Sequence, residues 1–278
     1  MLENFIYENH LSQRFVGLEN GVYINSNDLR DYKWSFDTIN GRISRFYRKT
    51  TNRKLPLTVM CNTGDEAVSA KNRLLEIAEA DIEAMIPGKI IIGDYYTNGY
   101  ITESSKSNYM VNRRYCKINL TLTSENDDSM WYREEPHVFP PGSGTQEANG
   151  TGMDYPYEYS YDYAISQAVN SIVCESVRAS AFRLKIYGQV TNPAVTISGH
   201  TYAVNGTVSE GETLLIDSIT KKITLTTASG TKINWFDKRN RESYIFQPIP
   251  AGINSVSSNG SFGFDLTVIE KRSEPRWT

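Results

Sequence analysis

Few side chains of the kind that perform catalysis occur in this sequence, and they lie far apart. The histidines and cysteines are His10, His137, His200, Cys61, Cys116 and Cys174. No two of them form a CxxC pair or the His-Glu-x-x-His motif of zinc enzymes. Neither a Gly-x-Ser-x-Gly nucleophile elbow nor a phosphate-binding Walker loop is present. We therefore expect no catalytic residues, no metal site, no cofactor and no disulfide framework.

Two pairs of adjacent acidic residues are candidates for the carboxylates of a glycosidase. They are Asp127–Asp128 and Glu134–Glu135. Glycoside hydrolysis needs two carboxylates that flank a cleft about 5 to 10 Å wide. Neighbouring residues on a strand point to opposite faces of the sheet, and both pairs lie near turns. We interpret them as solvated acids and predict that the protein is not an enzyme.

Tyrosine is the compositional outlier, with 18 copies among 278 residues. Tyrosine suits half-buried sheet faces and protein interfaces, because its ring has an apolar body and a polar tip. Trp131–Tyr132, Trp235–Phe236 and the tyrosine-rich segment 154–163 could also form a platform on which a sugar ring stacks. Packing in a core, at a sheet edge or between subunits is the favoured interpretation, and the sugar platform stays open as an alternative.

A cluster of basic residues occupies the segment from Gly41 to Lys54, which contains no acidic residue. Its cations are Arg42, Arg45, Arg48, Lys49, Arg53 and Lys54. A nucleic-acid site would use Phe46 and Tyr47 as stacking platforms beside them. We favour a solvated hairpin or a contact surface for an acidic neighbour, because the net charge of the whole chain is −3. These six residues are therefore candidates for an interface or for the lining of a lumen.

Composition and charge narrow the class of protein. Apolar residues make up 39% of the chain and charged residues 22%, which allows a buried core and argues against wholesale disorder. The balanced charge gives no field that would attract the whole protein to nucleic acid or to an anionic membrane. No basic N-terminal region with an apolar run follows Met1, and no run of about 18 apolar residues occurs. We expect synthesis in the cytosol and no membrane insertion.

One long helix is predicted over residues 63–85. Thr63 and Glu66 have the spacing of a capping box, in which each side chain accepts a hydrogen bond from the other residue's backbone amide. Apolar residues then recur at spacings of three and four, as one helix face requires. These residues are Ala67, Ala70, Leu74, Ile77, Ala78, Ile82 and Met85. Pro87-Gly88 ends the helix.

Most other segments alternate apolar and polar residues with a period of two, as half-buried strands do. In the first half, Trp34 and Phe36 show this pattern, as do Leu57 and Val59. In the second half, Phe182, Leu184 and Ile186 show it. Many short strands separated by Gly- and Asn-rich turns favour a sandwich or jelly roll in the second half. The predicted fold class is mainly β, with one long helix that makes the first domain α+β.

A Pro- and Gly-rich stretch separates the two halves. Residues 136–152 contain Pro140-Pro141 and several glycines, and we interpret them as a linker. The predicted organisation is an N-terminal domain over 1–135, the linker, and a C-terminal β-sandwich domain over 153–278.

An ordered series of segments resembles the distal tail protein (Dit) family of siphophages, the hub of the tail tip and baseplate. In the first half these segments are residues 81–96, which begin in the last turn of the capped helix, followed by Gly99–Thr102. In the second half they are Phe182–Gly188, Asn192-Pro193, Ile197–Tyr202, Gly211-Glu212, Ile216–Ser218 with Lys222, Ile249–Gly252 with Asn254, and Arg272–Trp277. The ordered series covers almost the whole chain.

The resemblance implies a structural virion protein at the tail tip, made in the host bacterial cytoplasm. It implies an N-terminal ring-forming β domain, a C-terminal galectin-like β-sandwich and a hexameric ring. Such a ring joins the tail tube protein to the tail-tip and receptor-binding proteins of the baseplate. The alternative function is a carbohydrate-binding module that recognises host cell-wall sugars. The sequence leaves open the host species, the ring size, the partner proteins, any glycan and the faces that form the ring interface.

Overall fold

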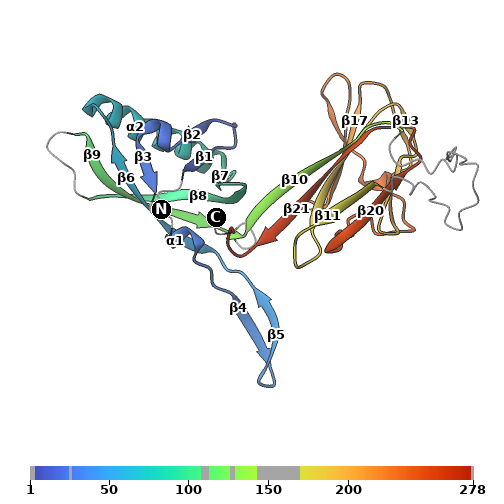
Figure 1. The fold of residues 1–278 in the computed structure, drawn as a ribbon, viewed down its shortest axis with the longest axis horizontal. Helices are drawn as coiled ribbons and strands as arrows, with labels where there is room; N and C mark the ends of the chain where they lie inside the picture. Colours follow the sequence, from blue (N-terminus) through green and yellow to red (C-terminus); the bar gives the residue numbers. More distant parts are fainter. Residues whose placement is uncertain (1–3, 25–26, 108–112, 126–128, 143–169, 277–278) are drawn as a thin grey trace, which may run out of the picture. The chain divides into compact units, whose positions relative to one another are not determined.

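The structure, a computed structural model, describes residues 4–24, 27–107, 113–125, 129–142 and 170–276. The chain divides into two compact units, and each is described by itself below. Unit 1 consists of residues 1–133 together with 271–278, and unit 2 consists of residues 134–270. The chain leaves unit 1 along β10 (Trp131–Phe139) and returns to it along β21 (Phe264–Arg272) (Figure 1).

Unit 1 contains two antiparallel sheets that share one long strand. Its further elements are β1 (Phe5–Glu8), β2 (Arg14–Val16), the 3-10 helix η1 (Leu18–Asn20), β3 (Val22–Ile24), α1 (Asn27–Arg30), β4 (Ser35–Ile39), β5 (Arg42–Tyr47), β6 (Thr51–Met60), α2 (Gly64–Ala84), β7 (Gly88–Ile92), β8 (Tyr95–Ser107) and β9 (Tyr115–Ser124). The start of β8 pairs with β7 in the order β2-β1-β7-β8, and its second part pairs with β9 in the order β3-β6-β9-β8.

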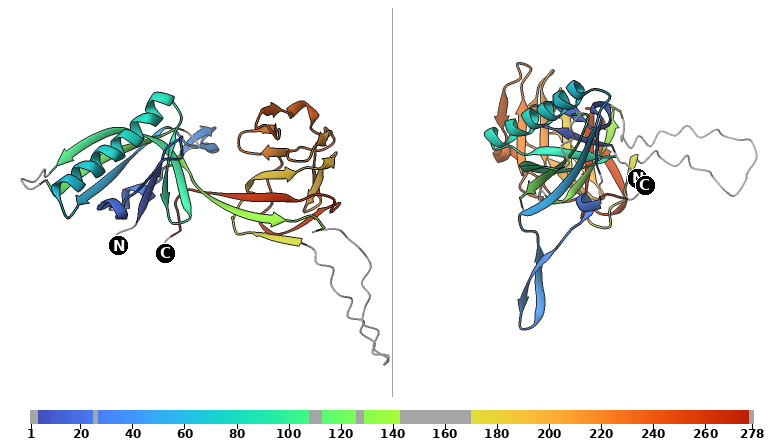
Figure 2. Two further views of the ribbon diagram at one scale, coloured as in Figure 1. Left: turned by 90° about the horizontal axis from the view of Figure 1, so that it is seen from above. Right: turned by 90° about the vertical axis from the view of Figure 1, so that its left-hand side faces the viewer.

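Helix α2 covers one face of these strands and closes the core of unit 1 (Figure 2). The predicted capping box is present: the Glu66 amide donates to Thr63 Oγ1 and the Thr63 amide donates to Glu66 Oε2, each at 3.2 Å. The predicted apolar stripe is buried as far as Ala78. Beyond it the prediction was wrong, because Ile82 and Met85 are exposed and the polar Asp81 is fully buried instead.

Unit 2 is a β-sandwich. Its further elements are β11 (Asn170–Cys174), β12 (Ala181–Tyr187), β13 (Val190–Thr191), β14 (Ala194–Ile197), β15 (His200–Ala203), β16 (Thr207–Val208), β17 (Thr213–Asp217), β18 (Lys222–Thr226), β19 (Lys232–Asn234), the 3-10 helix η3 (Phe236–Lys238) and β20 (Gly252–Ser258). One sheet has the order β19-β18-β17-β12-β21-β10 and the other β11-β20-β14-β15. Side chains from both sheets, such as Leu184 and Val195, share one buried core. The predicted class, mainly β with one long helix, is confirmed.

The two compact units differ from the expected domains at their boundaries. Residues 136–139, expected to begin a linker, continue β10, because the Phe139 ring is buried and stacks on Phe264 at a centroid distance of 4.6 Å. Residues 271–276 belong to unit 1, where Arg30 Nη1 donates to the Pro275 carbonyl at 3.0 Å. The rest of the expected linker and the tyrosine-rich segment 154–163 lie outside the described residues.

No helix in the part of the chain that the structure describes is long and apolar enough to cross a membrane.

Candidate interface arm

Strands β4 and β5 form a two-stranded ribbon that projects from the rest of unit 1, as Figures 1 and 2 show. We call residues 35–47 the arm. Its strands pair with each other in a sheet of their own. Asn40-Gly41 connects them, and both residues have positive φ, 51° and 76°. This is the geometry of a two-residue hairpin turn, for which Asn-Gly is a preferred sequence because glycine tolerates positive φ without strain.

The arm has one apolar face. Phe36 lies opposite Phe46 and Thr38 lies opposite Ile43 in the strand register, with a bulge between Asp37 and Thr38. Strand alternation places these side chains on the same face of the ribbon. The exposed fractions are 54% for Phe36, 53% for Ile43 and 58% for Phe46. An isolated two-stranded hairpin is marginally stable in water, and exposed contiguous apolar residues commonly mark an interaction site.

The other face of the arm is mixed, because it carries two cations together with Asp37 and Ile39, and Ile39 has an exposed fraction of 65%. Arg45 lies opposite Asp37 and Arg42 lies opposite Ile39. The Arg45 guanidinium lies 5.7 Å from the centroid of the Tyr47 ring, and Lys49 Nζ lies 5.9 Å from the same ring. Three of the six candidate cations, Arg42, Arg45 and Lys49, are therefore exposed on or directly beside the arm.

Arg48 differs from the exposed cations Arg45 and Lys49, because its side chain is buried at the root of the arm. Its guanidinium carbon lies 4.7 Å from the Trp34 ring centroid and 5.7 Å from the Tyr32 ring centroid. Trp34 in turn donates from Nε1 to Ser273 Oγ at 3.3 Å. Arg48 thus packs among the residues that attach the first strand of the arm to the segment after β21.

Arg53 is the second buried cation among the six candidates and lies on β6. Its Nη2 donates to the Ser129 carbonyl at 2.6 Å, and its Nη1 donates to Thr97 Oγ1 at 3.4 Å. Burial, and secondarily the positive charge of Arg48, lower the pKa of Arg53 to about 10. Its position between β8 and the segment before β10 makes it a structural cation of unit 1.

A hollow of about 440 Å³ opens at the root of the arm. Its lining residues are Asp31, Tyr32, Lys33, Arg48, Thr51, Asn52, Arg53 and Lys54. The exposed Lys54 lies on β6, which pairs with β9 and not with the arm. The six candidate cations therefore form three groups: exposed on or beside the arm, buried at its root, and exposed on β6.

The histidines have separate surroundings. His10 Nδ1 lies 2.7 Å from Asp81 Oδ1, His137 Nε2 lies 3.8 Å from Glu135 Oε1, and His200 Nε2 lies 3.0 Å from the Tyr244 carbonyl. Among the described residues, no group of three or more His, Cys, Asp or Glu side chains is placed to hold a metal ion.

The described acidic and aromatic candidates lie in ion pairs or in the interior. Glu134 pairs with Arg183 Nη1 at 2.8 Å, and Asp127–Asp128 lies outside the described residues. Trp131, Tyr132 and Trp235 are buried, so they pack in the interior and present no ring faces on which a sugar could stack.

Sequence reasoning missed two features of unit 1. The alternation of Trp34 and Phe36 with polar residues predicted a half-buried strand, whereas Phe36 is mostly exposed. Asp81 was not singled out, although it occupies a position of the helix that continues the buried face of Leu74, Ile77 and Ala78. A single carboxylate at such a position is a usable sequence signal, because burial of a carboxylate requires donors.

Comparisons with known proteins find similarity at the level of structure. No protein-family model and no curated protein sequence matches the chain. The solved structure of the Dit protein of phage SPP1, described as a paradigm of the hub adsorption apparatus in phages that infect Gram-positive bacteria, matches with a TM-score of 0.55 and 10% identity. That match covers 96% of this chain and 98% of the SPP1 protein.

Two structures of the phage P2 baseplate in its activated conformation also match. The structure with Ca has a TM-score of 0.62 at 13% identity, and the structure with Sr has 0.61 at 12% identity. Each match covers 99% of this chain and 100% of the baseplate chain. Both units of this chain therefore share their fold with phage hub and baseplate proteins.

Proposed function

We propose that this protein is a structural virion component that forms the distal tail ring of a bacteriophage. In this role it joins the tail tube to the baseplate or receptor-binding apparatus at the tail tip. The observation that carries the proposal is the fold match over 96–99% of this chain and 98–100% of the hub and baseplate chains. The extent of the match matters, because a match to the β-sandwich unit alone would reflect only a fold that many unrelated proteins share.

The arm supports assembly into a ring. A ring closes through a heterologous interface, in which one surface of a subunit meets a different surface of the next. The projecting apolar face with Phe36, Ile43 and Phe46 is suited to such a contact, since an interface would remove it from water. We assign Arg42, Arg45 and Lys49 to this interface and not to a lumen, because Arg42 and Arg45 are exposed on the opposite face of the same projecting ribbon and Lys49 lies directly beside it. Arg48 instead packs at the root of the arm, and Arg53 bonds to Thr97 and Ser129 within unit 1.

The proposed ring is a hexamer with two kinds of neighbour, the tail tube protein on one side and tail-tip or receptor-binding proteins on the other. Neither a membrane nor a specific nucleic-acid sequence is a proposed partner. The role is architectural, and no reaction is assigned to the protein.

Carbohydrate binding is the competing function. Its sequence argument depended on Trp235 and neighbouring aromatic residues as a sugar platform, and Trp235 is buried in the core of unit 2. Pull-down of the purified protein with host cell-wall material tests this function. Wall binding abolished by Trp235→Ala in a folded variant would favour it over the ring.

Mass measurement in solution tests the proposal. Light scattering or native mass spectrometry of the purified chain at micromolar concentration is expected to show a discrete assembly of six copies. A monomer at all concentrations up to about 100 µM, with and without the purified tail tube protein, would contradict the ring.

A further inference from the structure

The surface at the C-terminal end of α2 carries exposed apolar side chains surrounded by acids. Ile82, Met85 and Ile86 have exposed fractions of 44%, 83% and 50%, and Glu79 and Glu83 beside them are exposed. We call these five residues the α2 patch. They lie within eight consecutive positions at one end of the helix, so the apolar and acidic groups form one local surface.

The electrostatics of the α2 patch are unfavourable in a single copy of the chain. A helix C-terminus carries partial negative charge from its unpaired carbonyl groups, and cations in the last turn stabilise it. The last turn of α2 contains no basic residue, and Glu83 lies in it. A cation supplied from outside this helix end would therefore be stabilised by both the carboxylates and the helix dipole.

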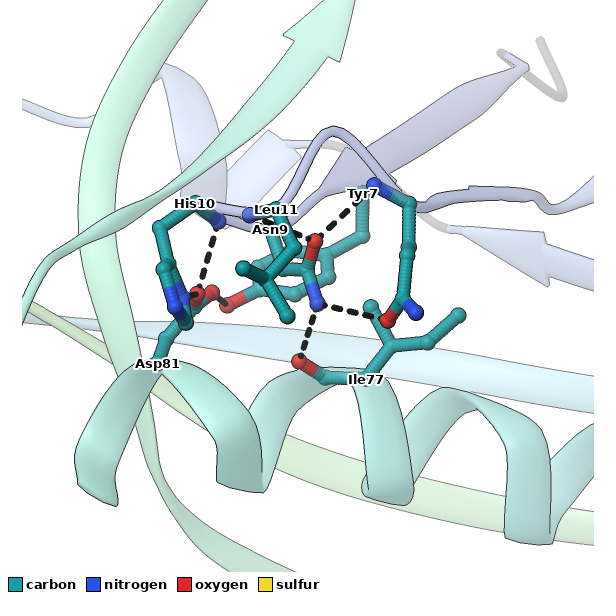
Figure 3. Close-up of polar contacts among 7 residues, drawn as sticks. Tyr7, Asn9, His10, Leu11, Ile77 and Asp81 are labelled. Atoms are coloured by element: carbon teal, nitrogen blue, oxygen red, sulfur yellow. Dashed lines mark hydrogen bonds and ion pairs between the residues drawn. The ribbon is translucent and has the colours of Figure 1, made fainter. Parts of the chain in front are cut away.

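The α2 patch is firmly attached to the body of unit 1. Directly beneath it, Asp81 Oδ1 accepts from the His10 amide at 2.8 Å and contacts His10 Nδ1 at 2.7 Å, while Asp81 Oδ2 accepts from the Tyr7 hydroxyl (Figure 3). Asn9 Nδ2 donates to the Ile77 carbonyl at 3.3 Å one turn earlier. The patch is thus a preformed surface, and binding there would not require the helix end to become ordered first.

The arm has the complementary properties. Phe36, Ile43 and Phe46 form an exposed apolar face, and Arg42 and Arg45 are exposed cations on the opposite face of the same ribbon. The two strands of a ribbon lie only about 5 Å apart, so long arginine side chains can reach past its edges toward a surface that the apolar face contacts. Unlike charges within a Debye length of about 8–10 Å attract one another at physiological ionic strength.

We propose that the arm of one copy docks on the α2 patch of a neighbouring copy. The apolar face of the arm covers Ile82, Met85 and Ile86. Arg42 and Arg45, on the opposite face, extend past the edges of the ribbon and bring positive charge near Glu79 and Glu83. The occupant is a second copy of this chain because each copy carries both surfaces, one basic and one acidic. The contact is heterologous, as a closed ring requires. This inference depends on the proposed ring and identifies the two surfaces that form it.

Charge reversal with rescue tests this pairing. R42E/R45E and E79K/E83K, each alone, are expected to raise the protein concentration needed for half-assembly at least tenfold. The combined variant R42E/R45E/E79K/E83K restores opposite charges at every contact, and half-assembly should return to within about threefold of the wild type. K222E/K232E is the matched control. It replaces two exposed lysines of unit 2 with acids, the same change in net charge as R42E/R45E, and should assemble like the wild type.

The outcomes separate this inference from the proposed function. The pairing would be overturned if both double variants formed rings at the wild-type concentration, or if the combined variant assembled no more readily than either double variant. Either result would leave the proposed ring intact. A wild-type chain that never assembles would refute the ring itself. Circular dichroism and thermal melting of each variant identify any loss of assembly caused by unfolding. If a charge-reversal variant unfolds, cross-linking provides a second test. The I43C/M85C variant treated with a bis-maleimide should form intermolecular cross-links. Their absence in assembled rings would overturn the pairing.

Discussion

His10 Nδ1 and Asp81 Oδ1 lie 2.7 Å apart, across 71 positions of sequence, in the interior of unit 1. Asp81 is fully buried and also accepts hydrogen bonds from the Tyr7 hydroxyl and the His10 amide. The carboxylate therefore connects the end of α2 to β1 and to the turn that follows it (Figure 3). Burial and this hydrogen bond to Asp81 raise the pKa of Tyr7, so its hydroxyl stays protonated and remains a donor.

Asp81→Ala should destabilise the protein strongly. It leaves the Tyr7 hydroxyl and the His10 amide without their acceptor, and each unsatisfied buried donor costs about 1–3 kcal/mol. We expect a loss of roughly 3 kcal/mol in the free energy of unfolding, measured by urea denaturation. Glu76→Ala, an exposed change on the same helix, is the control and should stay within about 0.5 kcal/mol. Equal stability of the two variants would contradict a structural role for Asp81.

Phe36→Ser together with Phe46→Ser should prevent assembly without unfolding the chain. Both rings are more than half exposed, so their removal creates no cavity in the core of unit 1. The two substitutions remove the centre of the apolar face that we propose to be buried between copies. Sedimentation velocity should show monomers, while the melting temperature of the monomer stays within a few degrees of the wild-type value. Assembly at wild-type concentrations would show that the arm is not an interface.

Arg48→Ala should loosen the root of the arm. The substitution removes the cation between the Trp34 and Tyr32 rings, an interaction of about 1–2 kcal/mol when it is sheltered from water. Limited proteolysis is the appropriate measurement, and cleavage within residues 31–50 should become several-fold faster. Arg45→Ala on the exposed face serves as the control and should leave the cleavage rate near the wild-type value. Equal cleavage of the two variants would argue against the anchoring role.

Tyr187 gives unit 2 a defined alkaline sensitivity. A hydrogen bond from its hydroxyl to the Asp265 carboxylate, then burial, raises the pKa of Tyr187 to about 12. Because the pKa of Tyr187 is higher in the folded chain, the unfolded chain loses this proton at a lower pH. The contribution of the protonated hydroxyl to the free energy of unfolding is therefore complete below about pH 10 and is lost between about pH 10 and 12. Tyr187→Phe should show a smaller decrease in stability across this window than the wild type. Parallel stability curves for the two proteins from pH 9 to 12 would contradict the assignment.

The helix and its start were predictable from sequence because their causes are local. Thr63 and Glu66 lie three residues apart, and the periodic stripe from Ala67 to Ala78 needs no distant partner to be recognised. Helical spacing places Asp81 on the buried face, but Tyr7, which donates to it, lies 74 residues away in sequence, so no local pattern identifies its hydrogen-bond donor. Ile82 was mistaken for a core residue because the apolar spacing continues past the point where the buried face ends.

The arm was predictable only in part. Asn40-Gly41 between alternating segments is a hairpin signal, and the basic cluster was recognised as a candidate interface. Alternation at Trp34 and Phe36 gives the same pattern for a strand on a core as for a strand facing a neighbouring subunit, so sequence could not reveal the exposure of Phe36. The separation of Arg48 and Arg53 from the other cations depends on the Trp34 ring and the Ser129 carbonyl, which are brought near by tertiary packing.

Negative-stain imaging of the purified full-length chain tests the central claim most directly. The account predicts closed rings with six-fold symmetry and a central opening in class averages, and loss of these rings in the Phe36→Ser/Phe46→Ser variant. Single particles with the mass of one chain, unchanged when tail tube protein is added, would contradict it.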